Sequence, residues 1–214
     1  MLAAVDFSNN LTWALLIGWI MSVVLHEFAH GLVAHLGGDY TIRERGGLTL
    51  NPLQYIDPLF SLIIPAIIFL MGGLPLPGGV TYVRKDLLRS RAWQSAVSAA
   101  GPLANFLLFL ICALPFHPYL GWITPEPTNG EWSTAVLFAG AFAWVQLIAV
   151  LFNLAPVPGL DGFGIIEPYF DQQTRESLTP QVRQSIFFLW FILLWKVDAI
   201  LLAFRVAVFG AAPE

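Results

Sequence analysis

The stretch LTWALLIGWIMSVVLHEFAHGLVAHL, residues 11–36, decides how this chain folds. It is apolar as far as Leu25 apart from two hydroxyl side chains, and as a helix it can cross a bilayer, because about 20 residues at 1.5 Å each span the hydrocarbon core. Near its end come His26, Glu27 and His30 in the spacing His-Glu-x-x-His. Side chains four residues apart share one helix face, so both imidazoles can bind one metal ion beside Glu27. The stretch therefore predicts a metal site within a membrane helix.

The composition of the whole chain agrees with a membrane setting. Of its 214 residues, 57% are hydrophobic and 11% are charged, whereas a soluble domain has roughly 25% charged residues. The N-terminus lacks a basic segment with a cleavage site, so we expect the first apolar run to be a retained helix. Cys112 is the single cysteine and forms no intramolecular disulfide. We predict one integral-membrane domain over residues 1–214, with its core at about 11–168 and a C-terminal helix at about 185–209.

Four segments are long and apolar enough to be transmembrane helices, namely Leu11–Leu36, Ala92–Leu114, Thr134–Leu154 and Ser185–Phe209. Helix-stop residues follow the first three, at Gly37-Gly38, Pro115 and Pro156. The Pro58–Met71 segment has only about 14 residues and contains Pro65, so it is short for a crossing. We predict an all-α polytopic membrane protein with about four transmembrane helices, a re-entrant or surface element at Pro58–Met71, and a small β-hairpin near the metal site.

Further motifs accompany the His-Glu-x-x-His pattern: NLAPVPGLDG at 153–162, GPLAN at 101–105, LTLNP at 48–52 and IDP at 56–58. Together they resemble the site-2 protease family of intramembrane zinc metalloproteases, in its compact form without a PDZ domain. Two positions depart from that pattern. Tyr55 stands where the compact branch usually has His, and Gly78–Thr81 stands where it commonly has Ala-Lys-Pro-Val.

The resemblance implies a catalytic zinc site. His26, His30 and Asp161 would be the three protein ligands of Zn²⁺, which leaves a fourth position for water, as in catalytic rather than structural zinc sites. Glu27 would act as general base toward the zinc-bound water. The substrates implied are other membrane proteins, cleaved in or near their transmembrane segments. Neither departure from the family pattern falls on the ligands or the base.

The metal site constrains the topology. His30 lies near the C-terminal end of the first span and Asp161 lies just beyond the C-terminal end of the third, so these two spans must run in the same direction to share one ion. One crossing, Ala92–Leu114, then separates them, and Pro58–Met71 must enter and leave on one side.

The basic residues agree with this topology. One side would hold every Lys and Arg outside the last span, namely Arg43, Arg45, Arg84, Lys85, Arg89, Arg91, Arg175 and Arg183. Residues 1–10 and 115–133, on the opposite side, contain none. By the positive-inside rule the basic side is cytoplasmic, so we expect the site to open toward the cytosol and the N-terminus to lie outside.

Several polar residues near the motifs allow more than one role. Asn105 could donate a hydrogen bond to the oxyanion or the substrate backbone, or it could bond to a neighbouring helix. Asn153, also a candidate for contact with substrate, is expected rather to satisfy backbone groups freed where Pro156 and Pro158 end the helix. Residues 78–83 are β-prone and could offer a strand edge to an unwound substrate, or form an ordinary loop.

Other polar side chains lack motif support as ligands. His35 lies about 140° around the helix from His30 and should point away from the metal. Glu44 and Asp57 stand in no ligand motif. Lys196 and Asp198 interrupt the last apolar segment, and the sequence indicates no role for them.

Two other classes of function remain for such a chain. A catalytically inactive zinc-binding scaffold or regulator would keep the fold, but it would have no need of Glu27. A metal transporter would spread its ligands through the depth of the bilayer, whereas these cluster at one level. The expected partners are membrane-protein substrates and the lipid bilayer, with no nucleic acid.

Overall fold

A computed structural model of the protein describes residues 10–57, 61, 63, 78–117, 120, 122 and 133–194. Three long helices dominate it: α1 (Asn10–Gly37), α4 (Arg91–Ala113) and α5 (Thr134–Asn153). Each is long and apolar enough to span a membrane. They confirm the first three predicted spans, and their bounds differ from the predicted ones by no more than one residue.

The remaining predicted segments fall partly outside the described residues. Helix α8 (Pro180–Leu194) covers the beginning of the fourth predicted span, and the rest of Ser185–Phe209 lies outside. The Pro58–Met71 segment lies outside as well, apart from Ser61 and Ile63. The described part of the chain therefore contains three candidate spans and leaves the predicted fourth and the re-entrant element as predictions.

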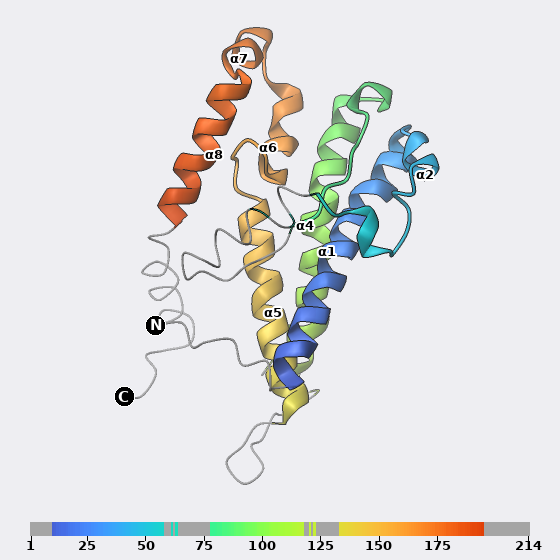
Figure 1. The fold of residues 1–214 in the computed structure, drawn as a ribbon, viewed down its shortest axis with the longest axis vertical. Coiled ribbons are helices and arrows are strands. Elements are labelled where there is room, and N and C mark those ends of the chain that lie inside the picture. The colour runs from blue at the N-terminus through green and yellow to red at the C-terminus, as the bar shows by residue number, and fades with distance from the viewer. Residues whose placement is uncertain are drawn as a thin grey trace.

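Helix α4 lies at the centre of the fold. It packs against α1, α5 and the short helix α6 (Asp161–Ile166). Along the bundle, α1 and α5 run in one direction and α4 runs in the other (Figure 1). The C-terminal ends of α1 and α5 consequently lie at the same end of the molecule, as the shared metal site requires.

Local sequence signals account for the helix ends. Gly38 follows α1 with φ of +122°, a left-handed conformation that favours glycine and stops the helix. Ser90 and Ser133 cap the N-termini of α4 and α5, because each side chain accepts a hydrogen bond from the backbone amide three residues on. Pro115 lies in the 3-10 turn η4 (Leu114–Phe116) that ends α4.

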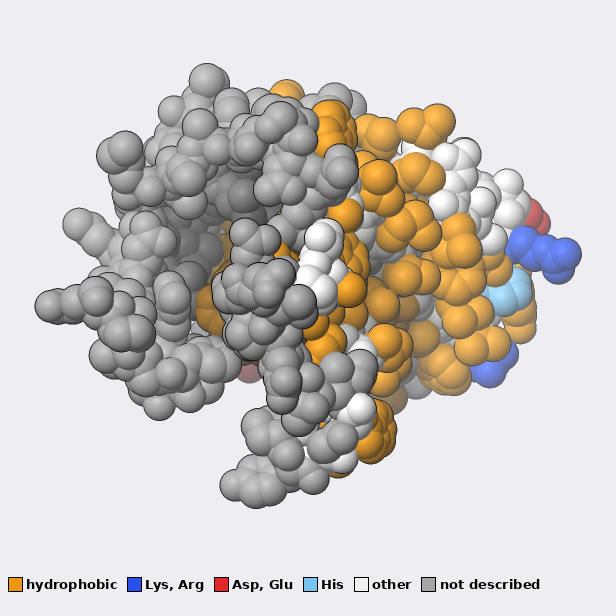
Figure 2. Space-filling view, turned by 90° about the horizontal axis from the view of Figure 1, so that it is seen from below, with side chains coloured by type: hydrophobic (Ala, Val, Ile, Leu, Met, Phe, Trp, Pro, Cys, Tyr) orange, Lys and Arg blue, Asp and Glu red, His pale blue; other side chains and the backbone are white. Residues whose placement is uncertain are grey.

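The outer faces of the long helices are apolar. On α4, Leu103, Leu107 and Ile111 form an exposed stripe with helical spacing, more than half of each side chain being accessible. Seen from below, the described surface is largely hydrophobic, and the basic side chains lie at one edge of this view (Figure 2). Exposed apolar helix faces of this length are typical of lipid contact, and the chain is a membrane protein.

Short elements gather at the end of the bundle where α1 and α5 finish. They are α2 (Thr41–Glu44), η1 (Pro52–Gln54), η3 (Lys85–Leu87), α6, η5 (Glu167–Tyr169) and α7 (Gln172–Ser177). A small buried core formed by Ala34, Ile42, Leu88 and Val97 joins α1, α2 and α4 there. This core fixes the end of α1 that carries the histidines.

Residues 78–84 run beside α1 without forming a strand. The Thr81 hydroxyl donates to the Glu27 carbonyl at 3.1 Å, and the Arg84 amide donates to the Asp39 carboxylate at 2.8 Å. Asp39, just after α1, is fully buried. The described residues contain no β-strand, so the predicted hairpin is not among them. This segment is held by the Glu27 backbone carbonyl of α1 and by the Asp39 side chain that follows it.

Candidate active site

The two histidines of the His-Glu-x-x-His motif project from α1 to the same point. Both are buried, and their Nε2 atoms lie 3.0 Å apart. The spacing of four residues places one imidazole a turn above the other, with the rings nearly perpendicular.

Asp161, the first residue of α6, completes the group. Its Oδ2 atom lies 3.1 Å from Nε2 of His26, and its Oδ1 atom lies 3.3 Å from Nε2 of His30. One ligand atom from each of the three residues falls within 4.8 Å of the others, so His26, His30 and Asp161 form a group that could hold a metal ion among the described residues. The structure thus brings together the three residues that the sequence motifs nominate.

The turn after α5 delivers Asp161 to this point. Gly159 has φ of +98°, which reverses the chain after Pro158. Gly162 packs so closely on the Leu154 carbonyl that any Cβ would overlap with it. The Pro-x-Pro-Gly-Leu-Asp-Gly sequence therefore folds α6 back against the end of α5 and directs its first side chain toward α1.

The two imidazoles are protonated on Nδ1, so both Nε2 atoms are free to bind a cation. Nδ1 of His30 lies 2.6 Å from the Val97 carbonyl, which can only accept, so this nitrogen carries the proton. Nδ1 of His26 faces the side-chain oxygen of Asn105 and donates to it. Both Nε2 lone pairs then point at each other and at the Asp161 carboxylate. Unprotonated nitrogens and a carboxylate in this arrangement repel one another unless a cation lies between them, so the donor set fits a metal ion.

The carboxylate of Asp161 is in the state that a metal requires. Burial alone would raise its pKa, but in the absence of a metal the positive charge of protonated His30 and His26 lowers the pKa well below its usual range, and a bound cation would supply that charge instead. Its Oδ2 atom is buried without an accepted hydrogen bond. A buried, ionised oxygen without a hydrogen bond is suited to bind a cation.

Gly101 allows α4 to lie directly against this group. A Cβ on Gly101 would overlap with the Nε2 atoms of both His26 and His30. Asn105 follows one turn later on the same face of α4 and bonds to His26. The Gly-x-x-x-Asn motif therefore has a physical reason: the glycine makes space for the ligands and the asparagine orients one of them.

The hydrogen bonds of Asn105 distinguish its two possible roles, donation to an oxyanion or substrate and bonding to a neighbouring helix. It is buried, and its amide nitrogen donates to Ser22 Oγ at 2.9 Å and to Gln146 Oε1 at 2.7 Å. It is absent from the residues that line the pocket. Since both of its N–H groups bond to neighbouring helices, the geometry favours the interhelical role over donation to an oxyanion.

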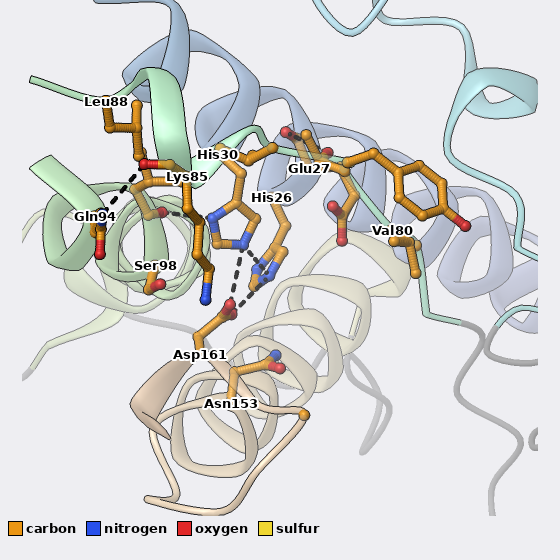
Figure 3. Close-up of a pocket in the computed structure, with 16 residues that line it drawn as sticks. His26, Glu27, His30, Val80, Lys85, Leu88, Gln94, Ser98, Asn153 and Asp161 are labelled. Carbon is orange, nitrogen blue, oxygen red and sulfur yellow. Dashed lines mark hydrogen bonds and ion pairs between the residues drawn. The ribbon is translucent and has the colours of Figure 1, made fainter. Parts of the chain in front are cut away.

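Asn153 lies at the pocket wall near Asp161 (Figure 3). Its amide donates to the Ala149 carbonyl at 3.0 Å, one turn back in its own helix. The expected bond to backbone groups at the Pro156–Pro158 turn is replaced by this local one.

Glu27 opens onto a pocket of about 350 Å³ beside the ligands. The pocket is lined by the two histidines, Glu27, Asp161 and residues 79–83, with Lys85 and Ser98 on its other side (Figure 3). Gly79 lies so close that a Cβ there would be 2.7 Å from the Glu27 Cγ atom. The carboxylate is therefore confined between α1 and residues 79–83, at the edge of the space that a substrate would enter.

The other acidic and histidine candidates lie elsewhere. The His35 ring packs on Tyr40 with centroids 5.2 Å apart, outside the metal-binding group. Asp57 accepts a hydrogen bond from the Tyr82 hydroxyl at 3.0 Å. Glu44, in α2, is also outside the group.

A charged cluster lies at the pocket edge. Glu167 bonds to Lys85 at 2.9 Å and to Arg183 of α8 at 2.5 Å. Burial opposes ionisation of Glu167, but the two cations lower the pKa of its carboxyl below its ordinary value. Through these two ion pairs, Glu167 of η5 connects Lys85 of η3 to Arg183 of α8, which are far apart in the sequence.

Sequence reasoning missed two residues behind the ligands. Gln146 is a fully buried amide in the middle of α5, and the Ser22 hydroxyl donates to its Oε1 at 2.8 Å. A glutamine in the middle of a transmembrane segment is costly without partners, and this cost was the available signal.

Similar proteins bear out the zinc chemistry. A protein named as a zinc metalloprotease, Rip2 of Mycolicibacterium smegmatis, is 38% identical over 163 residues, which are 76% of this chain and 60% of that protein. Rip2 of Mycobacterium tuberculosis H37Rv is 33% identical over 209 residues, covering 91% of this chain and 76% of its own length.

A relative from Bacillus subtilis gives the same result. YwhC of Bacillus subtilis, also named as a zinc metalloprotease, is 31% identical over 188 residues, covering 85% of this chain and 79% of that protein. No family model and no solved structure matches the chain. Zn²⁺ is accordingly the metal of this protein, and the chain belongs to the site-2 protease family.

Proposed function

We propose that this protein is an intramembrane zinc endopeptidase that hydrolyses peptide bonds in or near the transmembrane segments of other membrane proteins. One observation carries the proposal: a three-ligand metal group and an adjacent carboxylate open onto a pocket, and three of these four side chains belong to a helix apolar enough to span a bilayer.

The ligand set supports hydrolysis rather than a structural role. His26, His30 and Asp161 would hold Zn²⁺ with three protein ligands, the number typical of catalytic sites that also bind water. When bound there, Zn²⁺ would polarise the scissile carbonyl and acidify the attacking water.

Glu27 is the proposed general base. It removes a proton from the attacking water as the oxygen bonds to the scissile carbonyl carbon, and it passes that proton to the leaving amine as the C–N bond breaks. Its confinement between α1 and Gly79 supports this role, because a carboxylate that cannot swing away stays oriented toward the pocket.

Residues 78–83 are the proposed docking segment for an unwound substrate. Residues 79–83 of this segment line the pocket on the Glu27 side, and Thr81 ties the segment to the backbone of α1. An extended substrate could add to this segment through main-chain hydrogen bonds. An ordinary loop is the alternative, and substrates with N-methylated backbone amides near the cleavage site distinguish the two, because only docking through main-chain bonds would suffer.

We also propose that the site faces the cytosol, on the strength of the distribution of basic residues. Single cysteines in place of Arg43 and Arg84, in a Cys112→Ser background, can be labelled with a membrane-impermeant thiol reagent from either side. If Pro58–Met71 is re-entrant, both positions react from the cytoplasmic face. Labelling from opposite faces would show that this segment crosses the bilayer.

The direct test combines metal analysis with proteolysis. We expect the purified protein to contain zinc and to cleave a single-span model substrate within or beside its transmembrane segment, with loss on chelation and recovery on addition of Zn²⁺. Zinc binding without cleavage of any single-span substrate would favour the inactive scaffold. Ligand atoms clustered within 4.8 Å argue against a metal transport pathway, which vesicles loaded with a zinc indicator would check.

A further inference from the structure

Three buried polar side chains meet behind the metal ligands, one from each long helix. Ser22 of α1, Asn105 of α4 and Gln146 of α5 are 2%, 3% and 0% exposed. None of them lines the pocket, so none is placed to touch a substrate. Polar side chains at this depth are rare unless they have partners and a function.

We infer that Gln146 is a positioning residue for the zinc ligand His26 and acts on it through Asn105. This inference rests on the proposed zinc site. Gln146 Oε1 accepts hydrogen bonds from the Asn105 amide and from the Ser22 hydroxyl, and the second N–H of Asn105 goes to Ser22 Oγ. Only the side-chain oxygen of Asn105 is then left to face His26.

This arrangement determines which nitrogen of His26 is protonated. An oxygen facing Nδ1 requires a proton on Nδ1, and the Nε2 lone pair is then free for the metal. If the Asn105 amide turned over, its N–H would face Nδ1 and the proton would have to move to Nε2. A protonated Nε2 cannot bind zinc. Gln146 prevents this turn because its acceptor holds the Asn105 nitrogen on the far side.

The amide of Gln146 is itself incompletely bonded. Its Nε2 atom is buried without a hydrogen-bond partner, and a buried unsatisfied donor costs about 1–3 kcal/mol. An apolar residue of similar size would avoid that cost. The glutamine instead provides an acceptor atom, Oε1, which is bonded to Asn105 and Ser22.

His30 provides an internal comparison. Its Nδ1 proton bonds to the Val97 backbone carbonyl, which no side-chain substitution removes. The effect of Gln146 should therefore be confined to one of the two imidazoles, and zinc binding should be weakened rather than abolished.

The test measures zinc affinity by chelator competition in the full-length protein. Gln146→Met keeps the length of the side chain and removes the acceptor, and we expect it to lower zinc affinity roughly 10–100-fold, the usual effect of losing a partner of a ligand. The absorption spectrum of the Co²⁺-loaded protein should change as well, since it reports on ligand geometry. Gln146→Glu, neutral at this depth, keeps a carbonyl acceptor and should retain most of the affinity.

Phe142→Leu is the matched control. Phe142 lies one turn before Gln146 on α5 and packs against Gly18 of α1, away from the ligands. The Phe142→Leu variant should have lower thermal stability and unchanged zinc affinity. If it lowered the affinity as much as Gln146→Met does, helix packing and not the acceptor would be responsible, and the inference would fail.

Two outcomes separate this inference from the proposed function. If the wild-type protein binds no zinc, the proposed function fails first. If it binds zinc and Gln146→Met binds it equally well with the same Co²⁺ spectrum, only the role of Gln146 is overturned. Should Gln146→Met not fold, Ser22→Ala decides, because it removes one partner of Asn105 and must lower the affinity by a smaller factor; wild-type affinity in that variant would overturn the inference.

Discussion

The two sides of the imidazole pair are built differently. On the side of α4 and α5, the ligands meet the backbone at Gly101 and the neutral side chain of Asn105, and Gln146 lies behind Asn105; all three are buried. On the side of the pocket they meet the carboxylate of Glu27 and a segment without regular secondary structure. The first side is close-packed and the second is open.

This difference separates two tasks that a hydrolytic metal site has to perform. Ligand geometry must not change while substrates enter and products leave, so it is determined on the closed side. The reacting groups must reach solvent and substrate, so they lie on the open side. Changes on the closed side should therefore act on zinc affinity first, and changes on the open side should act on turnover with zinc retained.

Removal of Asp161 should have the largest effect, because this ligand contacts both imidazoles. Asp161→Ala leaves two imidazoles without a carboxylate, and we expect stoichiometric zinc and proteolysis both to be lost. His35→Ala is the control, because it removes a histidine of the same helix outside the metal group, and it should leave both properties intact. Metal analysis after gel filtration measures the first property. Loss of zinc from the His35 variant alone would contradict the ligand assignment.

A change of one atom on the open side should affect turnover only. Glu27→Gln keeps the size of the side chain and removes its basicity, so kcat should fall about 10²–10⁴-fold while zinc content stays at the wild-type level. Single-span substrate cleavage and metal analysis on the same preparation check the two halves. Near-normal cleavage would remove Glu27 from the mechanism.

Adding a single methyl group on the closed side should lower zinc affinity. Gly101→Ala places a Cβ against both ligand nitrogens, so α4 must move away and zinc affinity should drop roughly 10–100-fold. Gly140→Ala is the matched control on α5, where a Cβ would meet nothing within 4 Å. Equal zinc affinities in the two alanine variants would show that α4 does not press on the site.

The smallest effect is expected at the charged cluster. The pKa of Glu167 is lowered in the folded protein by Lys85 and Arg183, although burial opposes the shift, so its contribution is present above its unfolded pKa and is lost as pH falls through the folded pKa. Glu167→Gln should therefore cost about 1 kcal/mol at neutral pH and flatten the decline of thermal stability on acidification. If the melting temperatures of the variant and the wild type fell equally between neutral and acidic pH, this prediction would be wrong.

The sequence predicted the open side better than the closed side. His26, Glu27 and His30 follow from one spacing on one helix, and the three spans follow from apolar length. Asp161 followed from its motif, and the requirement that two spans run in the same direction followed from Asp161. These inferences use short-range geometry, which a sequence contains.

The closed side depends on how the helices are rotated about their axes. Ser22 was visible only as an interruption of an apolar run, and nothing in one sequence indicates that it faces Gln146, 124 positions away. The contact of Gly101 with the imidazoles and the pairing of Lys85 with Glu167 likewise result from packing between distant segments. Such contacts are determined by the shape of many side chains together.

Helix α1 carries more than the ligands and the base. Through the Glu27 carbonyl it holds Thr81, and through Asp39 at its C-terminal turn it holds Arg84, so residues 78–84 are fastened to it at two points. A rigid-body tilt or translation of α1 within the lipid would therefore move His26, His30, Glu27 and the adjoining segment as one frame. If the proposed function holds, bilayers of different thickness would then change how a substrate approaches this frame, while the position of residues 78–84 relative to Glu27 stays constant.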